Sequence, residues 1–113
     1  MPRLDLSCLN LKPRHLVLLQ SMLAEHVPLA EVWAYGSRVT GGAHECSDLD
    51  LVLRHYLDSA IDVPGWCEFK QALQNSTLPM LVDVHLWSRF PRAFHRNIES
   101  AYVVVREATA SKR

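Results

Sequence analysis

Two short apolar runs, each bounded by small or acidic residues, constrain the fold of this chain more than any other feature. The first run, Val32–Tyr35, ends directly at Gly36-Ser37, and the second opens at Asp48-Leu49-Asp50. Apolar runs of this length that stop at glycine are typical of buried strands. The pair Gly41-Gly42 lies between the two motifs and leaves room for one helical turn at 37–40. The sequence therefore predicts two strands joined by a loop with a small-residue turn at one end and two carboxylates at the other.

The remaining elements follow from hydrophobic periodicity. Apolar residues at helical spacing predict helices, and alternating or continuous short apolar runs predict strands. We expect a helix at 13–26, strands at 32–35 and 48–54, a helix starting near 62–64 and continuing to Leu73, a strand at 80–86, a helix at 91–101 and an extended segment at 102–105. This order predicts an α/β (α+β) fold, with a small mixed β-sheet and helices packed on one face.

Composition narrows the class of protein. The 113 residues suit one domain over 1–113, with residues 107–113 expected to fray. Lys plus Arg and Asp plus Glu both number 12, so the net charge is zero and no direct contact with nucleic acid is expected. No apolar run approaches the roughly 20 residues that span a bilayer, and no secretion segment opens the chain. A cytoplasmic protein without membrane contact is expected, and its three scattered cysteines indicate neither a disulfide framework nor a zinc site.

Three aspartates interrupt apolar strands. Asp48 and Asp50 stand two residues apart, so their side chains leave the same face about 6.5 Å from each other. Asp83 interrupts the later apolar run 81–84 in the same way. Carboxylates in such positions are costly unless a cation offsets them, and three of them suit Mg²⁺ or Mn²⁺. The alternative places Asp48 at a surface turn and Asp50 on a solvated edge, but it accounts neither for Asp83 nor for the upstream Gly-Ser.

The residues at the turn suit a phosphate group. Gly36 has no side chain, so a phosphate oxygen can approach its backbone. Ser37 offers a hydroxyl and a main-chain N–H at the start of a helical turn, where anions are favoured. Arg38 adds a positive charge that can meet a triphosphate, although such an arginine taken alone is more often solvated or ion-paired. Together with the aspartates, these residues indicate a protein that handles a nucleoside triphosphate.

This combination resembles the nucleotidyltransferase superfamily typified by DNA polymerase β. The fuller strings 33–38 and 47–51, in so short a chain, are similar to the minimal nucleotidyltransferase proteins, and the resemblance extends over roughly 16–105. It implies that Asp48 and Asp50 hold the metal ions, and that Asp83 touches the catalytic metal and helps to deprotonate the acceptor. It also implies that Gly36 and Ser37 hold the β- and γ-phosphates.

The resemblance also implies an activity and a partner. Members transfer a nucleoside monophosphate from a triphosphate to an acceptor hydroxyl and release pyrophosphate; for this chain we expect AMP from ATP, with Mg²⁺ or Mn²⁺. Minimal members often act as antitoxins beside a helical partner of the HEPN class, and some add AMP to a tyrosine of that partner. We therefore expect an antitoxin that adenylylates a HEPN-type toxin, in a homo- or hetero-oligomer. One alternative is a nucleotide-binding antitoxin that neutralises its partner by complex formation. Another is transfer to a small molecule, as in antibiotic-modifying relatives.

Some residues near these motifs keep two interpretations. His85 stands where relatives often carry a further acid, and it either lines the site beside Asp83 or is an ordinary strand histidine. His44 lies in the loop before the aspartates and is the other histidine to examine. Trp66, Phe69 and Leu73 are expected in the core, whereas three aromatic residues suit either the core or a partner surface: Trp33, Trp87 and Phe90.

Overall fold

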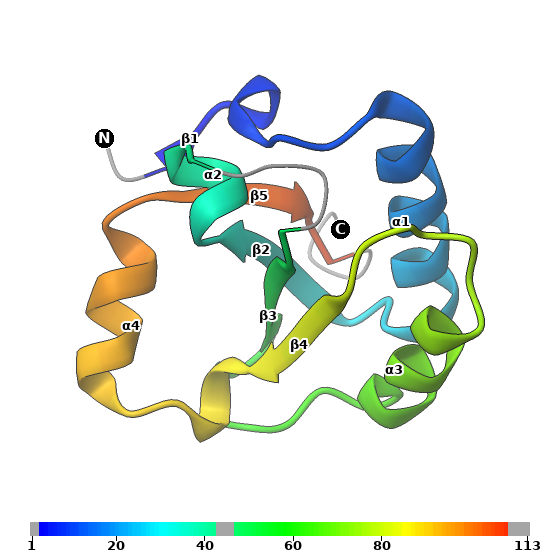
Figure 1. The fold of residues 1–113 in the computed structure, drawn as a ribbon. Helices are drawn as coiled ribbons and strands as arrows, with labels where there is room; N and C mark the ends of the chain where they lie inside the picture. The colour runs from blue at the N-terminus through cyan, green and yellow to red at the C-terminus, as the bar shows by residue number, and fades with distance from the viewer. Residues whose placement is uncertain (1–2, 43–46, 109–113) are drawn as a thin grey trace.

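The structure is a computed structural model that describes residues 3–42 and 47–108. Its elements are β1 (Arg3–Leu4), the 3₁₀ turn η1 (Leu6–Cys8), α1 (Pro13–His26), β2 (Ala30–Tyr35), α2 (Ser37–Thr40), β3 (Leu49–His55), α3 (Trp66–Gln74), β4 (Val82–Leu86), the 3₁₀ turn η2 (Trp87–Arg89), α4 (Arg92–Glu99) and β5 (Tyr102–Arg106). The strands form one sheet in the order β1-β5-β2-β3-β4 (Figure 1). None of the described helices is long and apolar enough to cross a membrane.

The sheet is mixed, as the sequence predicts. β2 lies at its centre and runs antiparallel to both β3 and β5, whereas β4 runs parallel to β3 and β1 runs parallel to β5. The parallel pairing of β3 and β4 requires a crossover, which α3 provides. This order leaves β4 at one edge of the sheet, next to the strand that carries Asp50.

One face of the sheet forms the main core with α1 and α3. Leu19 and Leu23 of α1 and Phe69 of α3 are completely buried. They belong to one hydrophobic cluster with Leu51 and Leu53 of β3, which occupy alternate positions along the strand. Full burial of such a side chain stabilises the fold by about 1.5–3 kcal/mol. The predicted alternation of β3, with leucines on one face and aspartates on the other, is confirmed.

The opposite face carries a second cluster that α4 covers. Trp33, Val52 and Trp87 pack there against Ile98 of α4. Trp33 stacks on Tyr102 with ring centroids 3.9 Å apart and meets Trp87 edge-on at 5.2 Å. The expectation that the helices share one face is therefore wrong for α4, because the apolar side chains that alternate onto this face also need cover. Trp33 and Trp87 are only 5% and 6% exposed, so both belong to the core.

Helix α3 begins later than the sequence predicts. The expected start near 62–64 is replaced by a start at Trp66, directly after Gly65, whose φ of +87° is left-handed. Asp62 does not cap the helix, because its carboxylate accepts a hydrogen bond from Arg89 at 2.7 Å and joins this loop to η2. Trp66 is only partly buried and packs against the edge of the main core, in which it was expected.

The carboxyl end of the chain packs beside β1. Arg3 Nη2 lies 3.9 Å from Glu107 Oε2, and Ala108 is 1% exposed. Of the tail expected to fray, residues 109–113 lie outside the described residues.

Candidate active site

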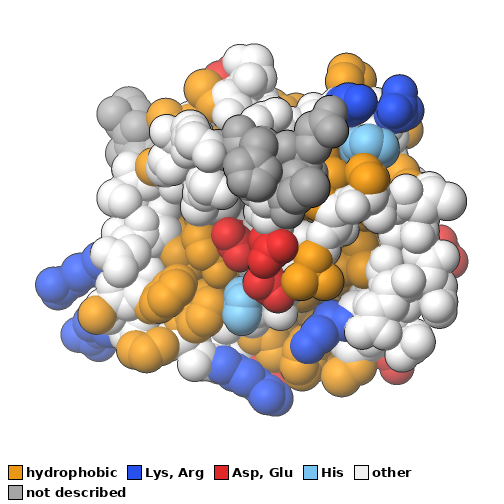
Figure 2. Space-filling model, in the orientation of Figure 1, with side chains coloured by type: hydrophobic (Ala, Val, Ile, Leu, Met, Phe, Trp, Pro, Cys, Tyr) orange, Lys and Arg blue, Asp and Glu red, His pale blue; other side chains and the backbone are white. Residues whose placement is uncertain are grey.

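Asp50 lies at the centre of a group of carboxylates on the face that also carries α4. In the sheet it is paired with Tyr35 of β2 on one side and with Asp83 of β4 on the other. Residues in register on neighbouring strands project to the same face, with α-carbons about 5 Å apart. Asp48 is exposed and directly precedes β3, one position before the start of the observed strand. Figure 2 shows the acidic side chains as one patch on the surface, bordered by a histidine and by hydrophobic side chains.

The charges of Asp48 and Asp83 act on the carboxyl of Asp50. Burial raises the pKa of Asp50 above its ordinary value, and the negative charges of Asp83 and Asp48 raise it further. His85 acts in the opposite direction on the same pKa. The ion pairs found among the described residues include none of these three acids. A half-buried carboxylate beside two others is a costly arrangement that a bound cation would relieve.

The donor set fits a hard divalent cation better than a softer metal. Mg²⁺ prefers oxygen ligands, and in nucleotide-binding proteins it is commonly held by one or two carboxylates together with phosphates of the substrate. In residues 3–42 and 47–108, no three His, Cys, Asp or Glu side chains are arranged to hold a metal ion among themselves. The three aspartates expected to form a metal site are therefore not arranged as a complete one within these residues, and an ion held there would need further oxygen ligands, such as phosphate oxygens.

Gly36, in the turn predicted to bind phosphate, lies directly beside Asp50. It adopts a φ of +84°, and a β-carbon at this position would lie 2.5 Å from Oδ2 of Asp50. Its carbonyl accepts hydrogen bonds from the N–H groups of Val39 and Thr40, both at 3.0 Å, which form the single turn of α2. Ser37 begins this turn and is exposed. The turn at 36–37 and the acids of β3 therefore form one continuous surface, as the motif spacing suggests.

Arg38 is placed differently from an arginine that faces a phosphate. It is 5% exposed, and its guanidinium donates to two main-chain carbonyls. Nε binds the oxygen of Ser47 at 3.0 Å, and Nη1 binds the oxygen of Asn10 at 2.7 Å. The N–H of Asn10 donates in return to the carbonyl of Arg38 at 2.7 Å. Arg38 thus ties the segment before α1 and the residue before Asp48 to α2.

A row of aromatic rings borders the carboxylates, and sequence reasoning did not find it. Tyr35 meets Phe94 edge-on at 6.3 Å, and Phe94 stacks on Phe90 at 4.4 Å. Phe90 in turn lies 5.0 Å from the ring of His85. Burial raises the pKa of Tyr35 far above its ordinary value, and the charges of the neighbouring Asp50 and Asp83 add to this shift. Only Tyr35, directly before the Gly-Ser turn, could have been found from its place in the motif.

Of the two histidines singled out in the sequence, His85 and His44, the structure describes only His85. His85 lies on β4 two residues after Asp83, on the same face of the sheet, and its charge acts on the pKa of Asp50. It therefore borders the site, as one of its two interpretations holds. His44 lies outside the described residues.

Comparison with known proteins agrees with the geometry. The family model described as "Nucleotidyltransferase domain" matches residues 18–105, a stretch that contains all the candidate site residues. The chain is also 35% identical over 99 residues to "Probable protein adenylyltransferase MntA" of Haemophilus influenzae, and the match covers 88% of this chain and 85% of that protein. A turn against paired strand carboxylates and a family match over most of the chain thus lead to the same conclusion: the chain belongs to the nucleotidyltransferase domain family.

Proposed function

We propose that this chain uses a divalent metal to transfer AMP from ATP to a hydroxyl of a partner protein, and that it acts as the antitoxin of a HEPN-type toxin. The single observation that carries the chemistry is the register of Asp50 with Asp83, beside the Gly36 turn. The class of acceptor is supported by the similarity to a protein whose name describes it as a protein adenylyltransferase. A tyrosine of the partner is the proposed acceptor.

The proposed reaction replaces a phosphoanhydride bond of ATP with a phosphodiester bond to the acceptor. A bond forms between the acceptor oxygen and the α-phosphorus, the bond from the α-phosphorus to the β-phosphate oxygen breaks, and pyrophosphate leaves. Asp48, Asp50 and Asp83 would hold Mg²⁺ or Mn²⁺, which neutralises the charge of the phosphates when bound. Asp83, at the outer strand, would accept the proton of the acceptor hydroxyl.

The remaining residues would position the substrate. Gly36 lets the phosphates approach the backbone, and exposed Ser37 would donate its hydroxyl to the β- or γ-phosphate. Arg38 would act indirectly, by fixing Ser47 and hence the start of β3 at Asp48. Positioning and charge neutralisation are the main sources of catalysis in phosphoryl transfer, so a small domain can supply them.

The proposal is tested with ATP labelled on the α-phosphate, Mg²⁺ and the protein encoded by the neighbouring gene. Label should transfer to that protein with wild-type enzyme and should fall by roughly 100-fold or more with Asp83→Asn, because a metal ligand is lost. Glu99→Gln, which makes the same carboxylate-to-amide change on an exposed residue of α4, should leave the transfer unchanged.

Growth assays separate catalysis from simple complex formation. If the Asp48→Asn, Asp50→Asn double variant no longer labels the partner and no longer suppresses its toxicity, transfer is the protective activity. If the double variant still suppresses toxicity fully, the antitoxin acts by complex formation and the catalytic proposal fails for this role.

A further inference from the structure

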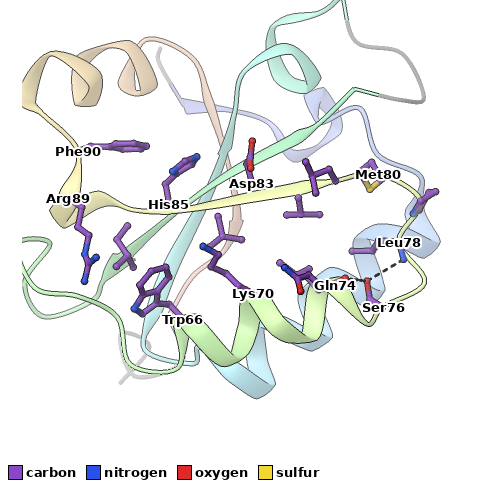
Figure 3. A pocket seen from close by; sticks show the side chains of 16 residues that line it. Trp66, Lys70, Gln74, Ser76, Leu78, Met80, Asp83, His85, Arg89 and Phe90 are labelled. Carbon is purple, nitrogen blue, oxygen red and sulfur yellow. Dashed lines mark hydrogen bonds between the residues drawn. The ribbon is translucent and has the colours of Figure 1, made fainter.

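A groove follows the outer edge of β4 and includes Asp83, one of the three carboxylates. Its lining residues come from β4, from the segments on either side of it, and from α3. Figure 3 shows Asp83, His85 and Phe90 on one side of the strand, and Lys70 and Gln74 of α3 on the other. A polypeptide lying along this edge would therefore have the active-site acids on one side and α3 on the other.

β4 is the last strand in the order of the described sheet and pairs there with β3. The N–H of Leu49 donates to the carbonyl of Leu81 at 2.9 Å, so Leu81 and Asp83 turn their backbone groups toward β3. Val82 and Val84 consequently turn theirs outward. Exposed edges are commonly protected by lysine, proline or a bulge, but β4 carries no lysine or proline and pairs with β3 in continuous register. Leu81 beside it is 63% exposed.

The geometry of the proposed reaction directs the acceptor to this edge; this step rests on the proposed function. In an in-line displacement, the attacking oxygen lies opposite the leaving group. The turn proposed to hold the pyrophosphate, Gly36-Ser37, follows β2, whereas Asp83 lies on β4, on the other side of Asp50. The acceptor hydroxyl must therefore arrive from the β4 side of the sheet.

The α3 side of the groove is positively charged. Lys70 is exposed, and its Nζ lies 5.0 Å from the ring centroid of Trp66. Arg89 approaches the same ring at 5.3 Å, but Asp62 already pairs with it. Asp83 is the one acid among the described residues that line the groove, and it lies on the opposite side of the strand. Lys70 therefore offers its charge to whatever occupies the groove.

We propose that the outer edge of β4 binds an extended segment of the acceptor protein as an additional strand. Side chains alternate along a strand, so a hydroxyl residue that faces Asp83 has neighbours that face α3. The segment then carries its acceptor hydroxyl on the Asp83 side and an acidic residue directly next to it, opposite Lys70.

Two synthetic peptides test this arrangement with labelled ATP and Mg²⁺. One is Thr-Val-Tyr-Glu-Val-Thr, and the other has lysine in place of glutamate. Wild-type enzyme should label the glutamate peptide on the order of 10-fold faster, since one charge pair is exchanged for a repulsion. Lys70→Glu should reverse this preference, whereas Arg96→Glu, the same kind of charge reversal on exposed α4, should preserve it.

Strand addition is tested separately by N-methylation of the glutamate peptide. Only alternate residues of an added strand donate to β4, so methyl groups on one alternate set of nitrogens should abolish labelling and those on the other set should not. Equal effects of the two sets, equal labelling of the glutamate and lysine peptides, or labelling of the partner protein by an enzyme that labels neither peptide would overturn the inference. A stable dimer of this chain that Val82→Pro dissociates would overturn it too, by assigning the edge to a second copy. Failure of the wild type to label the partner protein would overturn the proposed function itself.

Discussion

Gly36 and Asp50 are so close that no side chain fits between them. A β-carbon on Gly36 would lie 2.5 Å from Oδ2 of Asp50, well inside van der Waals contact. The same glycine has a φ of +84°, where residues other than glycine are strained. The turn before α2 and the central carboxylate of β3 thus pack directly against each other, because Gly36 has no side chain.

The first prediction separates these two roles of Gly36. Gly36→Ala should cost about 1–2 kcal/mol of stability from backbone strain and should also displace the carboxylate of Asp50, so that AMP transfer falls more than 10-fold. Gly41→Ala provides the control, because Gly41 has a φ of +103° but a β-carbon added there would meet nothing within 4 Å. Thermal unfolding and labelled-ATP assays would measure both effects. Equal loss of transfer in the two variants would contradict the importance of the contact.

The second prediction concerns how far the three clustered aspartates lower the free energy of unfolding. Because the pKa of Asp50 is raised in the folded protein, the folded state holds its proton more tightly than the unfolded state does. The free energy of unfolding therefore falls as pH rises from the ordinary carboxyl value to the raised pKa of Asp50, and the full destabilisation is present at neutral pH. Asp50→Asn should therefore raise the melting temperature of the metal-free protein at pH 7, on the order of a few degrees. The gain should vanish at a pH below the ordinary carboxyl value of 3.8. Glu99→Gln should show no such pH-dependent gain.

The third prediction is the pH dependence of metal binding. A proton on Asp50 competes with the cation, and its raised pKa lets this competition begin at a pH above the ordinary carboxyl value of 3.8. The affinity for Mn²⁺, measured by the electron paramagnetic resonance signal of the ion, should weaken as pH falls through the raised pKa of Asp50. The Asp50→Asn variant should bind Mn²⁺ more weakly at neutral pH and lose most of this pH dependence. An unchanged pH profile in the variant would show that Asp50 is not a ligand.

The fourth prediction concerns Arg38. Arg38→Met keeps much of the side-chain volume but removes the two hydrogen bonds that the guanidinium donates to the carbonyls of Asn10 and Ser47. The expected loss of stability is about 1–3 kcal/mol, at roughly 0.5–1.5 kcal/mol for each of these two partly buried hydrogen bonds. The loss should be similar with and without ATP, in urea unfolding. A variant of wild-type stability with reduced ATP affinity would instead mean that the guanidinium contacts the phosphates.

Most of the fold could be predicted because its elements have clear patterns. Helix α1 spans the predicted 13–26, since Pro13 and the leucine periodicity mark it without ambiguity. The pairing of Asp50 with Asp83 could also be anticipated, because each acid interrupts an apolar strand and only a shared site accounts for both. Local sequence and the cost of burying charge were sufficient in these cases.

What escaped prediction depends on contacts distant in sequence. α4 packs on the sheet face that carries Trp33 and Val52. That these side chains lie together on one face becomes clear only once the pairing of the strands is known. Arg38 donates to main-chain carbonyls, which every residue possesses. The residues that accept its hydrogen bonds therefore cannot be predicted from a pattern of side chains. The aromatic row formed by Phe90 and Phe94 is likewise a product of where η2 turns the chain.

The bonds from Arg38 to Asn10 and Ser47 join the segment before α1 to the strand that bears the acids. We therefore expect a shift at Asn10 to reach Ser47, the neighbour of Asp48, through one guanidinium and to alter the rate of transfer. Mutations early in the chain offer evolution a means of adjusting catalytic speed while the substrate-facing surface stays the same. An affinity tag on this end belongs among the variables of any kinetic assay.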